Sequence, residues 1–256
     1  MERLGRMPGS GLNRRAFVAT AGATAAWSLT TRSQAGEPSI TIGIPAYEGA
    51  DLLDMTGPYE MFNWAGFEID VLAVSPGPKL SGSGFSFLVH KGFAEARTYD
   101  AIWVPGGQPA ALASIIDDPA RSYLNFLTEQ ASRTRIMCSV CNGAMLLAAA
   151  GLLDGYQATT HWAFTSCFLQ RFPKVQVAPG HPRFVHDRNR LTAGGVASGL
   201  DLALKLIELL GNTKLAQRVQ QDTQYYPDPP VSSEIPSTPA DCSIPLSAGM
   251  SSRSPT

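Results

Sequence analysis

The 256-residue sequence lacks the common signatures of metal-dependent and nucleotide-dependent enzymes. It contains no His-Glu-x-x-His motif, no set of Cys and His at metal-ligand spacing and no phosphate-binding loop. The Gly-Ser-Gly stretch at residues 82–84 lacks the third glycine of a dinucleotide-binding loop. We therefore expect neither a metal ion nor a nucleotide cofactor.

A basic excess is also absent. The chain carries 20 Lys and Arg against 21 Asp and Glu. Five of the basic residues and one of the acidic residues lie within residues 1–35, which leaves 15 basic and 20 acidic residues in the rest. Because that charge is negative and no basic stripe or helix-turn-helix pattern is found, we expect no nucleic-acid partner.

No apolar run is long enough to span a bilayer stably. Residues 14 and 15 are both arginine, residues 18–29 are weakly hydrophobic, and residues 33–35 read Ser-Gln-Ala. This order is typical of a twin-arginine export signal that is cleaved after Ala35. It predicts a periplasmic or secreted protein with no membrane span once residues 1–35 are removed. The alternative is a disordered basic N-terminus.

Cysteine is scarce. The chain has four cysteines, at positions 138, 141, 167 and 242, and three of them lie in segments that resemble core or near-core elements. An oxidising compartment favours disulfides. A twin-arginine substrate is exported folded, however, so a thiol is buried before it meets that compartment. We therefore expect no obligatory disulfide.

The order of elements predicts an α/β protein. Removing 35 residues from 256 leaves 221, which fits one large domain over residues 36–226, followed by a Pro/Ser-rich tail over residues 227–256. The tail lacks periodicity, so we expect it to wrap around the domain or to be disordered. Expected strands cover residues 39–44, 67–73, 85–89, 102–104, 136–140, 175–177, 184–186 and 191–192, and expected helices cover residues 58–64, 119–131, 142–150, 162–171, 199–210 and 214–224. This alternation favours a mostly parallel sheet with helices on both faces.

The most informative stretch is residues 136–150, a buried strand that turns into an apolar helix with Cys141 at the turn. Gly143 removes a side chain where such a turn crowds the backbone. A thiol at a helix N-terminus is expected to favour its thiolate. The pattern predicts a nucleophile elbow with Cys in place of Ser. The alternatives are an inert buried cysteine, or a redox Cys-x-x-Cys pair with Cys138, which falls within the strand instead of at the turn.

Two other segments follow strands at the same edge of the predicted sheet, where ligands bind in open parallel sheets. In residues 46–57, Asp54 lies among apolar residues just before the helix that we expect at 58–64. A helix-entry carboxylate is the simple interpretation, but Thr56 is able to fill that role. Asp54 is then free to face Cys141, and the two groups would share one proton.

The third segment, residues 105–107, carries Gly106 and Gly107. Their amides, together with that of Asn142, are candidates for an oxyanion-type pocket, although a simple turn explains the glycines equally well. His161 is a candidate for lining the site, since its pKa suits proton transfer; a hydrogen-bonded core histidine is the alternative.

These segments together resemble the ThiJ/PfpI family of the class I glutamine amidotransferase-like superfamily, and within it the isonitrile hydratases. The resemblance extends over about residues 40–230. The segments that carry it are residues 53–60, 104–107, 139–143, 149–155, 158–162, 191–195 and 224–227.

The resemblance implies a flavodoxin-like three-layer sandwich, usually a homodimer, that works without a cofactor. It also implies a lyase that hydrates an isonitrile to an N-substituted formamide. Cys141 would attack the terminal carbon, and Asp54 would donate a proton and then activate water. The amides of Gly107 and Asn142 would hold the intermediate. Related hydratases carry Thr where this chain has Asn142, a difference expected at the mouth of the pocket, which leaves the substrate open.

Two other functions fit the same residues. One is an enzyme that acts on another small electrophile, such as a reactive carbonyl, through the same Cys–Asp pair. The other is a non-enzymatic periplasmic binding protein or redox sensor in which Cys141 is oxidised. A further branch of the family joins this domain to a DNA-binding module. We do not expect a regulator here, because the domain is followed by the Pro/Ser-rich tail and preceded by the export signal.

Overall fold

The structure is a computed structural model that describes residues 39–239 and residue 242. The predicted export signal at residues 1–35 lies outside the described residues, as does most of the tail beyond residue 239. All described residues belong to one compact unit.

A seven-stranded sheet in the order β10-β11-β7-β6-β1-β2-β5 forms the centre of the protein. All neighbours pair in parallel except β10 with β11. The strands are β1 (Thr41–Pro45), β2 (Glu68–Ala73), β5 (Lys91–Gly92), β6 (Ala101–Val104), β7 (Ile136–Ser139), β10 (Phe184–Asp187) and β11 (Arg190–Ala193). Every residue of β6 and β7 is buried, as expected for central parallel strands that are covered on both faces.

Two small sheets accompany the central one. β3 (Gly77–Leu80) and β4 (Ser86–Val89) form an antiparallel hairpin, and β8 (Gln157–Ala158) pairs in parallel with β9 (Gln176–Val177). Short 3₁₀ turns occur at η1 (Phe93–Glu95), η2 (Cys141–Gly143) and η3 (Trp162–Phe164).

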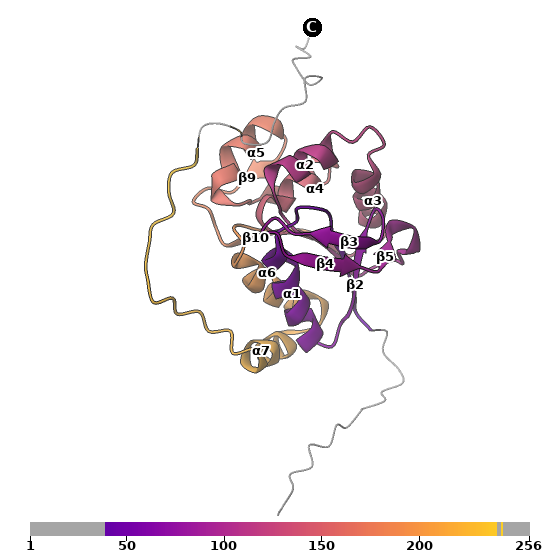
Figure 1. Cartoon of the computed structure of the whole chain (residues 1–256). Coiled ribbons are helices and arrows are strands. Elements are labelled where there is room, and N and C mark those ends of the chain that lie inside the picture. Colours follow the sequence, from indigo (N-terminus) through magenta and orange to yellow (C-terminus); the bar gives the residue numbers. More distant parts are fainter. Residues whose placement is uncertain (1–38, 240–241, 243–256) are drawn as a thin grey trace, which may run out of the picture. The chain divides into compact units, whose positions relative to one another are not determined.

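Helices cover both faces of the central sheet (Figure 1). On one face, α1 (Leu52–Trp64), α6 (Ser198–Leu210) and α7 (Thr213–Asp222) pack together, and on the other α2 (Pro109–Ile116), α3 (Ser122–Ala131) and α4 (Ala144–Ala149) do so. The two groups follow from right-handed crossovers, because the chain moves from β1 towards one edge and from β6 towards the other. α5 (Thr165–Arg171) lies beside β9. The predicted α/β sandwich is confirmed.

Within the described residues, none of the helices combines the length and the apolar character that crossing a bilayer requires.

Some element boundaries differ from the prediction. α1 begins at Leu52, six residues before the predicted start, because Pro58 lies inside the helix and not in its first turn. Thr56 is therefore not a cap, and its hydroxyl donates to the carbonyl of Leu52. The helix α2 and the short strands β3, β5 and β8 were not predicted, and α3 begins at Ser122 instead of residue 119.

The described chain after α7 runs outside the domain, from α7 towards the end of the domain where α5 lies (Figure 1). Cys167 of α5 and Cys242 form a disulfide, with their Cα atoms 4.4 Å apart. The expectation of no obligatory disulfide is therefore corrected for this pair. The two cysteines are 75 residues apart, and only the path of the irregular tail brings them together. Cys138 and Cys141 are free.

Candidate active site

The three segments singled out in the sequence meet at one edge of the sheet. They follow β1, β6 and β7, which are neighbours in the sheet and run parallel. The backbone joins them directly, since Asp51 N donates to Gly106 O at 2.8 Å and Val140 N donates to Val104 O at 3.1 Å. The convergence that the strand ends predicted is confirmed.

Cys141 sits at a strained turn. Its φ of 57° lies in the left-handed region, which a side chain rarely adopts, and such strain is common at functional positions. Its amide donates to Gly194 O at 2.7 Å, and its carbonyl accepts from Thr160 Oγ1 at 3.0 Å. A Cβ on Gly143 would lie 2.6 Å from Val104 O, so that the turn admits no side chain there. The turn has the geometry of a nucleophile elbow.

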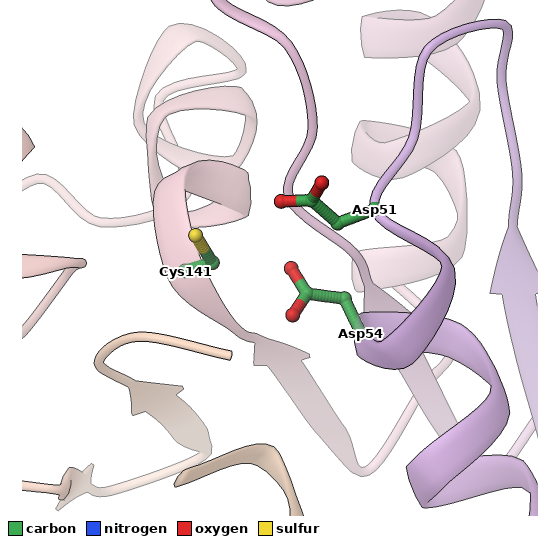
Figure 2. A group of neighbouring side chains, drawn as sticks. All are labelled: Asp51, Asp54 and Cys141. Atoms are coloured by element: carbon green, nitrogen blue, oxygen red, sulfur yellow. The ribbon is translucent and has the colours of Figure 1, made fainter. Parts of the chain in front are cut away.

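Asp54 projects from the first turn of α1 towards the sulfur of Cys141 (Figure 2). Its side chain is fully buried; Oδ2 accepts from Gly106 N at 2.9 Å, and Oδ1 has no hydrogen-bond partner among the described residues. Burial raises its pKa to about 8, although the bond from Gly106 acts in the opposite direction. At neutral pH the carboxyl is therefore mostly protonated, with one oxygen unused.

Pro58 and Trp103 fix the backbone of Asp54. In a regular helix the carbonyl of Asp54 accepts from the amide of residue 58, but proline has no N–H. The indole Nε1–H of Trp103, in the buried strand β6, donates to this carbonyl at 2.9 Å instead. Because Pro58 cannot donate to it, the carbonyl of Asp54 is free to accept from Trp103, and this hydrogen bond joins the site to the central sheet.

Replacing Trp103 with phenylalanine should leave the carbonyl of Asp54 without a partner and destabilise the fold by about 1–3 kcal/mol. The free energy of unfolding in urea measures this loss. Trp64→Phe, at a half-exposed position of the same helix, is the control, with an expected change within about 0.5 kcal/mol. Equal losses in the two variants would contradict the role assigned to the indole.

Asp51 is a site residue that the sequence reasoning missed. It occupies the N-cap position of α1, yet its side chain makes no capping hydrogen bond. Its carboxylate points instead towards Asp54 and Cys141, and one ligand atom from each of the three side chains lies within 4.8 Å of the others (Figure 2). Burial raises its pKa, while His161 lowers it. The helix was predicted to begin at residue 58, which placed Asp51 in the preceding loop with no local signal of a role in the site.

The charge state of Cys141 differs from the expectation. Burial raises the pKa of its thiol well above the usual value, and the Asp54 carboxyl raises it further. The backbone amides of Asn142 and Val196 face the sulfur and lower the pKa, but by less. The predicted preference for a thiolate is therefore wrong in the unliganded site. α4 has only six residues and little dipole with which to offset burial.

Asn142 has a different place from the one predicted. Its side chain is buried, and it closes a pair of hydrogen bonds with Gly107: Gly107 N donates to Oδ1 at 2.8 Å, and Nδ2 donates to Gly107 O at 2.8 Å. The amide of Gly107 is therefore not available to an intermediate, and that of Gly106 is used by Asp54. Both glycines were predicted as oxyanion donors; the amides that face the sulfur are those of Asn142 and Val196.

Gly106 is nevertheless part of the site. A Cβ on this residue would lie 2.5 Å from Asn142 Oδ1, 2.8 Å from the Cβ of Cys141 and 2.9 Å from Asp54 Oδ2. The missing side chain is what lets the three groups converge.

His161 lines a cavity of about 320 Å³ beside the elbow, together with Trp162 and residues 194–198. Its Nδ1 accepts from Ala163 N at 3.2 Å, so that the neutral ring carries its proton on Nε2. Burial lowers its pKa and Asp51 raises it, with a net decrease. A neutral histidine at this wall is able to donate a hydrogen bond into the cavity.

Within the described part of the chain, Asp51, Asp54 and Cys141 form a group that has the donors for a metal ion. Binding would have to displace the protons that burial keeps on Asp54 and Cys141. The arrangement is therefore better suited to moving protons between a thiol and a carboxyl.

Comparisons with known sequences and with solved structures point to the same family. The DJ-1/PfpI family profile matches residues 40–209. The chain is 34% identical over 201 residues to isonitrile hydratase of Pseudomonas putida, which covers 78% of this chain and 85% of that enzyme. A crystal structure of a ThiJ/PfpI family protein from Pseudomonas syringae superposes with a TM-score of 0.68 at 33% identity, covering 76% of this chain and 78% of that one. The HTH-type transcriptional regulator GbdR of Pseudomonas aeruginosa is 31% identical over 148 residues, 58% of this chain but 37% of the regulator.

Proposed function

Because the chain belongs to the DJ-1/PfpI family, we propose that it is a cysteine-dependent hydratase that converts an isonitrile to an N-substituted formamide. The observation that carries the proposal is the unpartnered Oδ1 of the buried Asp54, which lies in the same cluster as the Cys141 sulfur. The similarity to the Pseudomonas putida enzyme, which covers most of both chains, supports the choice of substrate class.

The proposed reaction needs one proton carrier and one nucleophile. The Cys141 sulfur bonds to the terminal carbon of R–N≡C while Asp54 gives its proton to that carbon and takes the proton of the thiol. The product is a thioimidate, R–N=CH–S–Cys. Asp54 then protonates the nitrogen and takes a proton from water as the water oxygen bonds to the same carbon. Transfer of the remaining hydroxyl proton to sulfur breaks the C–S bond, releases R–NH–CHO and restores both groups.

The buried site suits this sequence of steps. A neutral thiol and a neutral carboxyl exchange protons without creating a full buried charge, which would be costly. The amides of Asn142 and Val196 stabilise the partial negative charge on the sulfur as its proton passes to Asp54. Asp51 lies in the same cluster and His161 lines the neighbouring cavity, so these two side chains would orient the water that hydrolyses the thioimidate.

The alternatives fit less well. A redox-sensing cysteine needs a low thiol pKa and exposure, whereas Cys141 is buried and its pKa is raised. The similarity to GbdR covers only about a third of that regulator. A reactive carbonyl remains chemically compatible with the same Cys–Asp pair and is therefore included in the test.

The test is formamide formation from a simple aliphatic isonitrile by the purified protein with its free thiols reduced, followed by proton NMR. We expect catalytic conversion to the N-substituted formamide. A lack of turnover with isonitriles, accompanied by turnover of a small reactive carbonyl such as a 2-oxoaldehyde, would contradict the proposed substrate while retaining the site.

Export and a homodimer are further parts of the proposal. The twin-arginine pattern supports export, and sequencing the N-terminus of the secreted protein tests cleavage after Ala35. The family resemblance supports a dimer, and so do the exposed apolar side chains of Tyr59 and Leu88, which line a cavity of about 300 Å³. Light scattering measures the mass in solution.

A further inference from the structure

The cavity beside the elbow borders the segments that position Cys141, although Cys141 itself does not line it. Three of its lining residues are in direct contact with the nucleophile's backbone or sulfur. Thr160 Oγ1 donates to the carbonyl of Cys141, Gly194 O accepts from its amide, and the amide of Val196 faces the sulfur. A molecule in this cavity of about 320 Å³ therefore lies against the segments that hold the thiol.

One side of this cavity comes from the C-terminal tail. Ile235 lines it, although every other lining residue belongs to residues 160–162, 181–183 or 194–198. Ile235 is 55% exposed, so it contributes little to the core. The catalytic domain alone thus leaves this side open.

The tail is attached to the domain in two ways, by contacts of Thr238 with residues that line the cavity and by a disulfide. Residues 226–237 are all exposed and form no regular element. Thr238 Oγ1 donates to Trp162 O at 3.1 Å and lies 3.5 Å from His181 Nε2, and Cys242 is joined to Cys167 by the disulfide. Because so little of the segment is buried, noncovalent contacts hold it weakly, and the disulfide keeps it near the cavity.

We propose that residues 227–239 form a removable wall of the substrate cavity and that Ile235 is a specificity-determining residue, which excludes bulky molecules from Cys141 while the Cys167–Cys242 disulfide is closed. The proposal rests on the proposed function in taking this cavity as the substrate's approach. Small, compact isonitriles would pass Ile235, and substrates with a bulky or aromatic group would be rejected. Loss of the side chain or of the disulfide widens the approach.

Alkylation of Cys141 tests this inference without relying on turnover. The thiol displaces iodide from iodoacetamide or from its bulkier N-phenyl derivative, forming an S–C bond and passing its proton to the buffer. Because Cys138 and Cys167 lie in the same tryptic peptide as Cys141, fragment ions in tandem mass spectrometry assign each adduct to its cysteine. The quantity of interest is the ratio of the two rate constants, bulky reagent over small.

In Ile235→Ala and in Cys242→Ser this ratio should rise about tenfold, the usual effect of a side chain that fills an apolar pocket. Val231→Ala is the matched control, since Val231 is an apolar residue of the same segment, 78% exposed and outside the cavity lining. An unchanged ratio in the first two variants, or an equal rise in Val231→Ala, would overturn the inference. The ratio of alkylation rates does not depend on formamide formation. The proposed hydratase function and the proposed role of Ile235 can therefore each fail without the other.

Discussion

Replacing Cys141 with alanine should lower formamide production by a factor on the order of 10⁵, because the variant has no atom that can bond to the isonitrile carbon. The remaining groups, Asp54 and the amides that face the sulfur, would still bind the substrate but would have nothing to activate. Steady-state formamide formation by wild type and variant measures the factor.

Cys138→Ala provides the matched control for this experiment. Cys138 is a second free cysteine, buried in β7 three residues before the elbow. Burial raises the pKa of its thiol, which Arg190 lowers by less. The variant should keep turnover and lose only the packing of one small side chain. A Cys141→Ala variant that keeps substantial turnover would rule out the thiol as nucleophile.

Asp54→Asn should lower turnover by about 10²–10⁴, the usual contribution of a positioned proton donor and acceptor. The amide keeps the shape of the carboxyl and the acceptor for Gly106 N, but it carries no transferable proton. In the wild type, kcat/KM should decrease as the pH rises above about 8, where Asp54 loses its proton. A variant that retains turnover and the wild-type pH profile would show that another group carries the proton.

The same substitution should stabilise the fold. The pKa of Asp54 is raised from 3.8 to about 8, so between these values the folded state binds more protons than the unfolded state. The contribution of this group to the free energy of unfolding therefore falls as the pH rises through that window. Asparagine, which never ionises, avoids this loss. Asp54→Asn should be more stable than wild type at pH 8, with a difference that shrinks towards pH 4.

Asp70→Asn is the control for the unfolding measurement, because it should change the free energy of unfolding in the opposite direction. Burial raises the pKa of Asp70, but Lys91, Tyr99 and Arg97 together outweigh burial and lower it. This carboxylate stabilises the fold above its unfolded pKa, and that stability is lost as the pH falls through the folded pKa. Asp70→Asn should thus be less stable than wild type at pH 8. A loss of stability in Asp54→Asn at that pH would contradict the burial argument.

The sequence predicted the features that depend on local pattern. Residues 136–140 form an apolar run that identifies the buried strand β7, and Gly143 identifies the turn that follows it. Both features depend on only a few neighbouring residues, so they can be read from the sequence. Parallel strands place their carboxyl ends together, so Asp54 and Cys141 were expected at the same edge, where Figure 2 shows them.

The features that were missed depend on contacts between distant segments. Asp51 lay in the loop before the helix predicted at residues 58–64, and only the fold brings its side chain to the site. Asn142 could not be assigned to Gly107, which is 35 residues away, and Pro58 read as a helix start because its lost hydrogen bond is replaced by Trp103 of β6. The turn alone predicted a low pKa for the Cys141 thiol, but burial in the surrounding core raises that pKa.

Tandem mass spectrometry of the peptide that contains Cys138 and Cys141, in samples quenched during turnover of an aliphatic isonitrile, tests the central claim most directly, because fragment ions assign an adduct to one of the two cysteines. The proposed mechanism predicts a transient increase equal to the mass of the isonitrile, located on Cys141 and absent once the substrate is consumed. Formamide production without that adduct, or with the adduct on Cys138, would contradict covalent catalysis by the Cys141–Asp54 pair.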